Sequence, residues 1–402
     1  MPEWPSTLDV TELMADGWRP TPFRQFILKL HSRCDLACDY CYMYEMADQS
    51  WRSRPRRMSP AIMSAVATRI AEHVHAHALP SVEVILHGGE PLLAGREPIR
   101  EAVSSIRAAV GPGSRVDVSL QTNATLLDTA YLRLFDELDV RIGVSLDGDA
   151  EMHDRNRRRP NGDGSHSAVT AALELLSSPP FRHLFAGLLC AVDLRNDPIA
   201  TYGALLEFDP PAVDFLLPHG NWSAPPPGRV PGSDATPYAD WLITVFDRWY
   251  GSPRQPTRIR LFGEIMHLLL GGASTNEQVG LSPAGMVVVE TDGGIEQSDI
   301  LKSAYDGAAS TGLHVTRDPF DTALMLPSVA ARQIGELALA PQCTSCPVAR
   351  VCGGGLYAHR YRAGNGFANP SVYSPDLLRL ITHIRRTLAA DVSTLKGSHE
   401  PP

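Results

Sequence analysis

The strongest constraint on the fold is the alternation of strand-like and helical patterns along the first half of the chain. Six apolar, strand-like runs occupy residues 23–31, 82–87, 116–121, 140–146, 185–192 and 213–218. Helical patterns lie between most of them: Ser59 and Pro60 form a cap and first turn, and Ile62, Val66 and Ile70 follow on one face. Strands that alternate with helices pair in parallel through right-handed crossovers. The sequence therefore predicts an α/β fold, a complete or partial barrel with its functional groups at the carboxyl ends of the strands.

Three cysteines follow the first strand-like run with the spacing Cys-x3-Cys-x2-Cys: Cys34, Cys38 and Cys41. Because the loop is short, their thiolates can converge on one centre. Three thiolates can hold three irons of a cubane and leave the fourth iron open, whereas a structural zinc ion takes four protein ligands. The spacing favours an open iron–sulfur cluster over a zinc site or a buried cysteine trio.

The other four cysteines divide into a second group and one isolated residue. Cys343, Cys346 and Cys352 are close enough in sequence to ligate either zinc or an iron–sulfur cluster. Cys190 lies inside an apolar strand-like run, where a free cysteine packs as a small hydrophobic side chain. Grouped cysteines indicate metal binding in a reducing compartment rather than a disulfide framework, so we expect a cytoplasmic protein.

Polar residues and glycines follow the next three strand-like runs. Gly88, Gly89 and Glu90 come after the second run; the glycines let a ligand approach the backbone, and the carboxylate could accept from an ammonium group. Asn123 and Ser145 follow the third and fourth runs. Taken alone, two glycines after a strand are as consistent with a tight turn as with a ligand site.

Composition restricts the classes of partner. The net charge is −9, from 36 Lys and Arg against 45 Asp and Glu, so we expect no nucleic-acid partner. No apolar stretch reaches the ~18 residues of a membrane span, and no secretory signal begins the sequence, so we expect no membrane association. Two basic runs, at residues 52–57 and 155–159, are of a kind that is usually solvated surface; binding of an acidic peptide is the alternative.

The first cysteine motif resembles the signature of radical S-adenosylmethionine (SAM) enzymes, with Tyr40 before its last cysteine and Tyr42 after it. The resemblance implies a partial (β/α)6 barrel and a [4Fe–4S] cluster whose open iron chelates SAM, which is cleaved to a 5′-deoxyadenosyl radical. The glycine segment is similar to the family's Gly-Gly-Glu-Pro element beside the SAM amino group. The implied cofactor-binding residues are Tyr40, Gly88, Gly89, Glu90, Asn123 and Ser145, the last two near the ribose and carboxylate.

The C-terminal region is similar to SPASM-type extensions, which carry auxiliary iron–sulfur clusters in peptide-modifying radical SAM enzymes. Residues 352–361 and 366–373 resemble the FxsB-type, cyclophane-forming maturases, as do His219 and residues 289–297. The resemblance implies an auxiliary cluster at Cys343, Cys346 and Cys352. Where the family pattern has a further cysteine this chain has Ser374, a poor iron ligand, so the fourth ligand of that cluster is left open.

The resemblance implies an enzyme that modifies a ribosomally made precursor peptide. A radical formed at one Cβ would attack a nearby aromatic ring, and loss of an electron and a proton would leave a carbon–carbon crosslink. Candidate bases for that proton are His219, Glu290 and Asp292, at expected strand-end or hairpin positions. An external electron donor is required, and either a separate leader-binding protein or the basic runs would hold the leader.

Two kinds of alternative remain open at this point. The first keeps the radical chemistry but yields a thioether, an ether or an oxidised side chain. The second is a zinc-stabilised module that binds peptides without turnover.

The domain organisation follows from changes in composition. We expect an irregular segment over residues 1–22, the radical SAM partial barrel over 23–221, and a Pro-rich connector with two helices, 237–250 and 258–270, within 222–284. A SPASM-like region over 285–390 would begin with a hairpin turning at 292–294 and end with a helix over 376–388. Residues 391–402 are expected to be a disordered tail.

Overall fold

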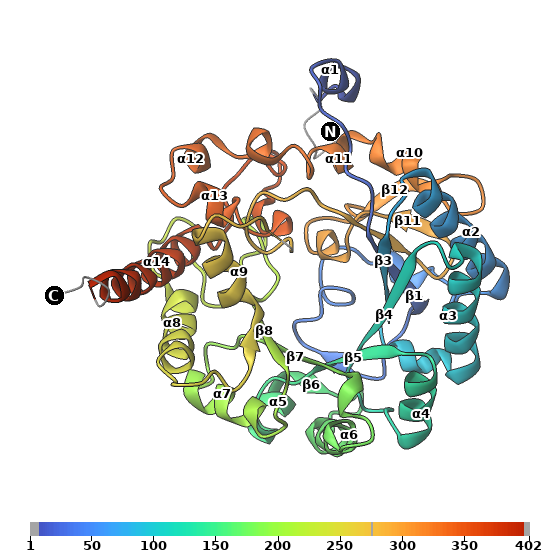
Figure 1. Cartoon of the computed structure of the whole chain (residues 1–402), viewed down its shortest axis with the longest axis horizontal. Coiled ribbons are helices and arrows are strands. Elements are labelled where there is room, and N and C mark those ends of the chain that lie inside the picture. Colours follow the sequence, from blue (N-terminus) through green and yellow to red (C-terminus); the bar gives the residue numbers. More distant parts are fainter. Residues whose placement is uncertain (1–7, 275, 398–402) are drawn as a thin grey trace.

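The computed structural model describes residues 8–274 and 276–397, and a curved parallel sheet lies at its centre (Figure 1). Each of its six central strands pairs in parallel with its neighbours, in the order β1-β3-β4-β5-β7-β8. Their bounds are Gln25–His31 for β1, Ser81–Gly88 for β3, Arg115–Thr122 for β4, Val140–Ser145 for β5, Phe185–Ala191 for β7 and Ala212–Leu216 for β8. The six strands and the partial barrel expected from the sequence are confirmed.

Helices connect consecutive strands and lie outside the curved sheet (Figure 1). They are α2 (Pro60–Ala76), α3 (Arg96–Val110), α4 (Thr129–Glu137), α5 (Ala150–Asn156), α6 (His166–Ser177) and α7 (Pro198–Leu206). The Ser59 side chain caps α2 by accepting from the Ile62 amide, and Val66 and Ile70 are fully buried. Packing of these apolar faces on the strands leaves the strand ends free to carry polar side chains.

The hairpin expected at residues 285–295 exists, but it joins the barrel sheet rather than beginning a separate region. Strand β10 (Met286–Val289) pairs in parallel with β1, and β11 (Gly294–Glu296) and β12 (Ser310–His314) continue the sheet antiparallel. The free edge of β1 explains this placement, since an apolar strand covers its unpaired backbone groups. At the opposite edge β9 (Arg258–Ile259) pairs with β8, which makes ten strands in this sheet among the described residues.

The remaining helices lie beside the open side of the barrel. They are α8 (Pro237–Tyr250), α9 (Arg260–Leu269), α10 (Phe320–Leu324), α11 (Pro327–Ala330), α12 (Pro341–Thr344), α13 (Ala349–Cys352) and α14 (Ser374–Gly397). Helix α14 packs against α8 and α9, and its C-terminal end points away from the barrel (Figure 1). None of the helices described in the structure is long and apolar enough to cross a membrane.

Two expectations about the ends of the chain were wrong. The lead-in is not wholly irregular, because α1 (Val10–Ala15) forms a short helix whose cap, Asp9, accepts from the amides of Thr11 and Glu12. The expected disordered tail is helical up to Gly397, since α14 continues beyond its predicted end. Both helical segments are too short or too polar to show the apolar periodicity by which a helix is predicted from sequence. Residues 1–7 and 398–402 lie outside the described residues.

Candidate functional site

One cavity of about 220 Å³ opens at the carboxyl ends of the parallel strands. The first cysteine group lies on the loop after β1, and its middle member belongs to β2 (Ala37–Cys38), which pairs with β6 (Arg157–Arg158). The cavity is lined by side chains from this loop and from five strand ends, including Cys34, Cys38, Cys41, Gly88, Gly89, Asn123, Ser145, Asp147, Ala191 and His219. The fold thus brings the first cysteine group together with the polar residues that the sequence places after β3, β4 and β5.

Close backbone approach explains the two glycines at the end of β3. A Cβ on Gly88 would overlap the His31 carbonyl oxygen, and a Cβ on Gly89 would lie 2.5 Å from the Arg33 carbonyl carbon and overlap the Tyr44 hydroxyl. The amide of Gly89 also donates to the His31 carbonyl. The cysteine loop is therefore packed directly on the glycines, and only hydrogen fits between them.

Replacement of Gly89 by alanine tests this contact. Because the neighbouring atoms are backbone, Gly89→Ala should lower the free energy of unfolding by about 1–3 kcal/mol. Urea unfolding would measure the change, with Gly113→Ala as the control, since Gly113 is exposed and has open space around its Cβ position. Equal stability of the two variants would contradict the packing argument.

The thiols of the first group are buried, and this affects their charge. Burial raises the pKa values of Cys34 and Cys41 and raises that of Cys38 to about 11. The Cys34 sulfur accepts from the Leu36 amide at 3.4 Å and from the Asn123 side-chain amide at 3.6 Å. Thiolates in such a site form when bound metal displaces the protons.

The arrangement of the sulfurs fits a cluster better than a single ion. Within the described residues, the groups whose ligand atoms all lie within 4.8 Å of one another contain no cysteine. Two thiolates on one zinc ion lie at most about 4.6 Å apart, since each Zn–S bond is about 2.3 Å. In each cysteine group at least one pair of sulfurs is therefore spaced too widely for one ion. Three donors with one open position suit a cubane.

The expected cofactor residues do not all face the cavity. Tyr40, Gly88, Gly89, Asn123 and Ser145 line it, but Glu90 does not. The Glu90 carboxylate is buried and accepts from the amides of Leu92 and Asn123 and from the Thr122 hydroxyl. Burial raises its pKa to about 7. These contacts fix Glu90 beside Asn123, and its contact with an ammonium group stays a prediction.

Arg157 and Asp147 also line the cavity, and of these two Arg157 was missed in the sequence. The β2–β6 pairing sets Arg157 opposite Cys38, and its Nη1 donates to the Tyr40 hydroxyl at 2.9 Å. That hydroxyl donates to Asp147, whose other oxygen accepts from the Ala191 amide at 2.9 Å. The Arg157 Nε is buried without a hydrogen-bond partner. A buried guanidinium with free donors is suited to bind a carboxylate.

Arg52, Arg56 and Arg57 of the first basic run are exposed, as expected, but each run also has an arginine held by contacts within the fold. Arg157 belongs to the second run, and Arg54, in the first, forms ion pairs with Asp292 and Glu296. Arg158 pairs with Asp39 at the surface. Arg157 could have been identified as a cavity residue only from its strand pairing with Cys38, and the sequence alone does not reveal that pairing.

His219 is the candidate base that the structure brings into the cavity. It follows β8, and its ring lies 4.6 Å from that of Tyr42 and 5.8 Å from that of His359, measured between ring centroids. Its Nδ1 is buried without a hydrogen-bond partner. Burial lowers the pKa of His219 to about 4 and also lowers that of His359, so both imidazoles are neutral at pH 7. A neutral ring with an unpartnered nitrogen can accept a proton.

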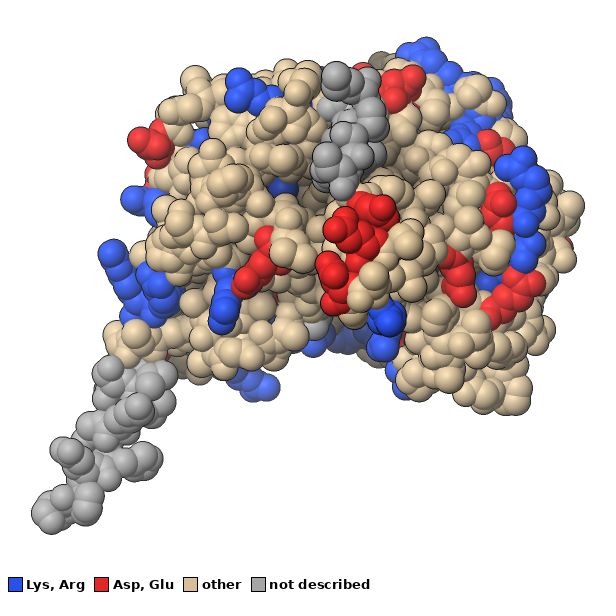
Figure 2. Space-filling model, turned by 90° about the horizontal axis from the view of Figure 1, so that it is seen from above, with Lys and Arg blue, Asp and Glu red and all other residues tan. Residues whose placement is uncertain are grey.

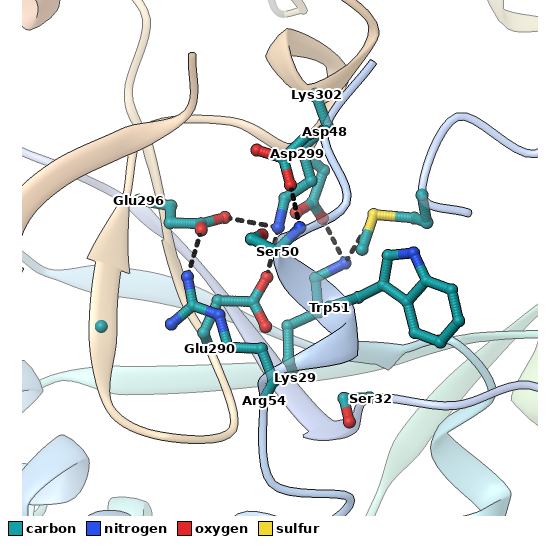
Figure 3. A network of polar contacts seen from close by, with 12 residues as sticks. Lys29, Ser32, Asp48, Ser50, Trp51, Arg54, Glu290, Glu296, Asp299 and Lys302 are labelled. Carbon is teal, nitrogen blue, oxygen red and sulfur yellow. Dashed lines mark hydrogen bonds and ion pairs between the residues drawn. The ribbon is translucent and has the colours of Figure 1, made fainter. Parts of the chain in front are cut away.

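Glu290 and Asp292 are held in ion pairs instead, and neither lines the cavity. Figure 3 shows Glu290 in its network. Glu290 accepts from Lys302 Nζ at 2.6 Å, and Asp292 pairs with Arg54. The same buried network includes Glu296, 2.8 Å from Lys302 Nζ, and Asp299, 2.5 Å from Lys29 Nζ. These contacts give Glu290 and Asp292 a structural function; a catalytic one stays a prediction.

The same network also contacts the loop that carries the first cysteine group. Lys29 Nζ, at the centre of β1, lies 3.6 Å from the Met43 sulfur and 3.4 Å from His87 Nδ1. On the other side, the amide of Asp48 donates to the Lys302 carbonyl within η4 (Asp299–Ser303). The loop is thereby attached both to the barrel and to the residues after the hairpin (Figure 3).

In the second cysteine group Cys343 lies in α12, Cys346 lies between α12 and α13, and Cys352 ends α13; Arg360 is near them. Burial raises the pKa of Cys343 and raises that of Cys352 to about 11. Arg360 is buried, donates to the carbonyls of Gly353 and Gly355, and lies over the Tyr357 ring. Ser374 is the first residue of α14, directly after Tyr373, whose ring lies 4.9 Å from that of His359. A series of rings thus runs from Tyr42 through His219 and His359 to Tyr373.

Charges on the surface are mixed. In the view of Figure 2, Lys and Arg residues are interspersed with Asp and Glu residues. Together with the net charge of −9, this distribution does not favour a polyanionic partner.

The sequence of the barrel matches a known family. Residues 28–184 match the model of the Radical SAM superfamily. This part of the chain is similar to the radical SAM domain. The matched residues include the first cysteine group, the paired glycines and the ends of β4 and β5.

Curated relatives extend the similarity to most of the chain. The serine-type anaerobic sulfatase-maturating enzyme of Klebsiella aerogenes is 25% identical over 364 residues, which cover 88% of this chain and 84% of that protein.

Two solved structures have the same fold. The structure of native anSMEcpe with bound AdoMet and the Cp18Cys peptide superposes with a TM-score of 0.76 at 21% identity, covering 93% of this chain and 100% of that one. The structure of Streptococcus suis SuiB bound to the precursor peptide SuiA gives a TM-score of 0.56 at 13% identity, covering 90% and 78%.

Proposed function

We propose that this protein is a radical SAM enzyme that forms a carbon–carbon crosslink in a ribosomally made precursor peptide, between an aromatic ring and the β-carbon of a nearby residue. The observation that carries the proposal is the joining of Cys34, Cys38 and Cys41 with the paired glycines in one cavity, inside the segment that matches the superfamily. Similar proteins that mature sulfatases or bind precursor peptides support a peptide substrate. The crosslink itself rests on the resemblance of the C-terminal region to cyclophane-forming maturases.

The residues that line the cavity are the basis for the proposed cofactor assignment. Cys34, Cys38 and Cys41 would hold a [4Fe–4S] cluster, which with SAM supplies the 5′-deoxyadenosyl radical when both are bound. Gly88 and Gly89 let the cysteine loop pack at the end of β3 beside the SAM site, and Asn123 and Ser145 would present polar groups to SAM. Arg157 is placed to neutralise a carboxylate, and Tyr40 and Asp147 hold its guanidinium in position.

The reaction must remove two hydrogens from the peptide. One Cβ hydrogen atom leaves with the deoxyadenosyl group, and the carbon radical adds to the ring. An electron then passes to an iron–sulfur acceptor, for which Cys343, Cys346 and Cys352 would be the ligands, and a proton passes to a base. His219 is our candidate for the base, since its neutral ring faces the cavity and its Nδ1 is unpartnered. An external electron donor would supply the electron for SAM cleavage, and the acceptor would have to pass its electron on, to the first cluster or to an oxidant in solution, before the next turnover.

Substitution of His219 tests its role as the base. His219→Leu should lower the yield of crosslinked peptide by about 10²-fold or more, because the ring proton loses its acceptor. Formation of 5′-deoxyadenosine should continue, since it precedes that step. Product mass and deoxyadenosine would be measured together, with the exposed His183→Leu variant as control. An unchanged crosslink yield would remove His219 from the mechanism.

Oxidation of a serine or cysteine side chain is the second candidate function. The similarity to the serine-type sulfatase-maturating enzyme favours it, because that similarity covers 88% of this chain. The first half-reaction would be the same, but no aromatic ring would take part. Both reactions would use the same cavity, so analysis of the product formed from a defined peptide is needed to distinguish them.

A peptide with a ring-deuterated aromatic residue separates the two products. Formation of the carbon–carbon crosslink replaces one ring deuterium, so the product should be lighter by one deuterium and one hydrogen. A thioether, an ether or an oxidised side chain retains every ring deuterium. Retention in a product that has nonetheless lost two hydrogens would overturn the crosslink while leaving the radical SAM assignment intact.

The cytoplasmic location and the leader-binding partner are also part of the proposal. All seven cysteines are free, which suits the reducing cytoplasm. A separate leader-binding protein would supply the affinity for the leader peptide.

A further inference from the structure

Two histidines and an aspartate converge outside the barrel, where α2 meets α10. His73 and His77 lie four residues apart on one face of α2. The carboxylate oxygen Oδ1 of Asp321, in α10, lies 2.5 Å from His73 Nδ1 and 3.0 Å from His77 Nε2. One oxygen and two imidazole nitrogens therefore meet at a single point. None of the three residues lines the cysteine cavity.

Of the three side chains, His73 is buried, whereas His77 and Asp321 are accessible to solvent. His73 is 2% exposed and packs against the rings of Phe23, Phe26 and Phe320. Burial lowers the pKa of His73, so the imidazole is neutral and one of its nitrogens carries a free lone pair. The side chains of His77 and Asp321 are 27% and 45% exposed. The outer side is thus open to an ion from solvent and to a water ligand.

We propose that His73, His77 and Asp321 form a site for a divalent transition-metal ion of the Zn²⁺ class, with water as the fourth ligand. Two imidazoles and a carboxylate are borderline ligands, which suit zinc better than calcium or magnesium. Their ligand atoms all lie within 4.8 Å of one another, as one shared ion requires. Bonds of about 2.0–2.1 Å would need the half-exposed Asp321 carboxylate to move outward by less than about 1 Å.

The other group of converging ligands in the described part of the chain does not carry the same inference. Glu290, Glu296 and Asp299 also lie within 4.8 Å of one another, but Lys302 and Lys29 already neutralise them. At the α2–α10 contact, no lysine or arginine ion pair with Asp321 exists among the described residues. An ion there would join the first barrel helix to the segment after β12, away from the cysteine cavity and separate from the proposed chemistry.

The test measures zinc in the full chain after its iron–sulfur clusters have been reconstituted. Wild type, His77→Ala and Asp321→Ala would be incubated with zinc, desalted and analysed for zinc and iron. The matched control is His75→Ala, on the same helix, because His75 instead bonds the Val110 carbonyl. Iron content and circular dichroism verify that each variant is folded and loaded.

We expect wild type and His75→Ala to retain one more zinc per chain than His77→Ala and Asp321→Ala. We also expect added zinc to raise the melting temperature of the first pair only. Zinc bound by the cysteines contributes equally to all four proteins and cancels in the comparison. Equal zinc content in all four would overturn the site and show that the carboxylate only hydrogen-bonds the two imidazoles.

Discussion

Replacing Lys302 by methionine should lower the free energy of unfolding by about 3–5 kcal/mol, the cost of leaving a buried charge without its partner. Its ammonium group lies 2.6 Å from Glu290 and 2.8 Å from Glu296, and all three side chains are at most 4% exposed. Methionine fills a similar volume but leaves Glu290 without its cation and Glu296 with Arg54 alone. Chemical denaturation at pH 8 would measure the loss.

The pH dependence of this variant provides a second readout. Burial already raises the pKa of Glu296 to about 7 in the wild type, well above the 4.5 expected of an unfolded chain. A raised carboxyl pKa means that protonation favours the folded state. Lys302 lowers this pKa, so its removal should raise the pKa of Glu296 further. The deficit of Lys302→Met should therefore be largest at alkaline pH, shrink as the pH falls toward 7, and level off below, where the carboxyl is protonated in both proteins.

A surface ion pair gives the control for this experiment. Arg182 pairs with Asp209, and their side chains are 43% and 74% exposed. Arg182→Met should cost no more than about 1 kcal/mol, because water screens and replaces the interaction. If Lys302→Met were equally mild, the buried network would not hold the hairpin against the cysteine loop, and its carboxylates would have to be neutral.

The sequence was sufficient where a residue's own neighbours determine its structure. Alternation of apolar runs located all six central strands, because a buried strand needs such a run wherever it lies. The position of Cys34, Cys38 and Cys41 after β1 followed from the same pattern, since parallel strands place their carboxyl ends on one side. His219 reached the cavity for this reason too, as it follows the sixth strand.

The sequence was insufficient to predict the position of a residue where contacts with residues distant in the chain determine it. Arg157 lies in a charged run typical of surface, yet its pairing with Cys38 turns it into the cavity. Glu90 follows the glycines as a ligand residue would, but the amides of Leu92 and Asn123 hold its carboxylate. The valines of β10 join β1 across more than 250 residues of chain. In each case tertiary contacts override the local pattern.

Substitution of Cys38 should abolish SAM cleavage, the largest effect on activity that the site implies. Removing one of three protein ligands leaves the cluster without a complete anchor, so Cys38→Ala should bring 5′-deoxyadenosine formation to background. Iron should fall from about eight to about four per chain if both cysteine groups carry cubane-sized clusters. Cys190→Ala is the control, because Cys190 is buried within β7, does not line the cavity and should leave iron unchanged.

A triple variant of Cys343, Cys346 and Cys352 completes the argument, because it separates cleavage of SAM from completion of the product. Loss of about four irons with SAM cleavage retained would place a second cluster at this group despite Ser374. The crosslink should then fail, since the electron from the ring would lack its acceptor. If wild type and triple variant both hold about four irons, only the first group carries a cluster. An acceptor in solution would then have to take the electron directly, and the rings from His219 to Tyr373 would have no part in its exit.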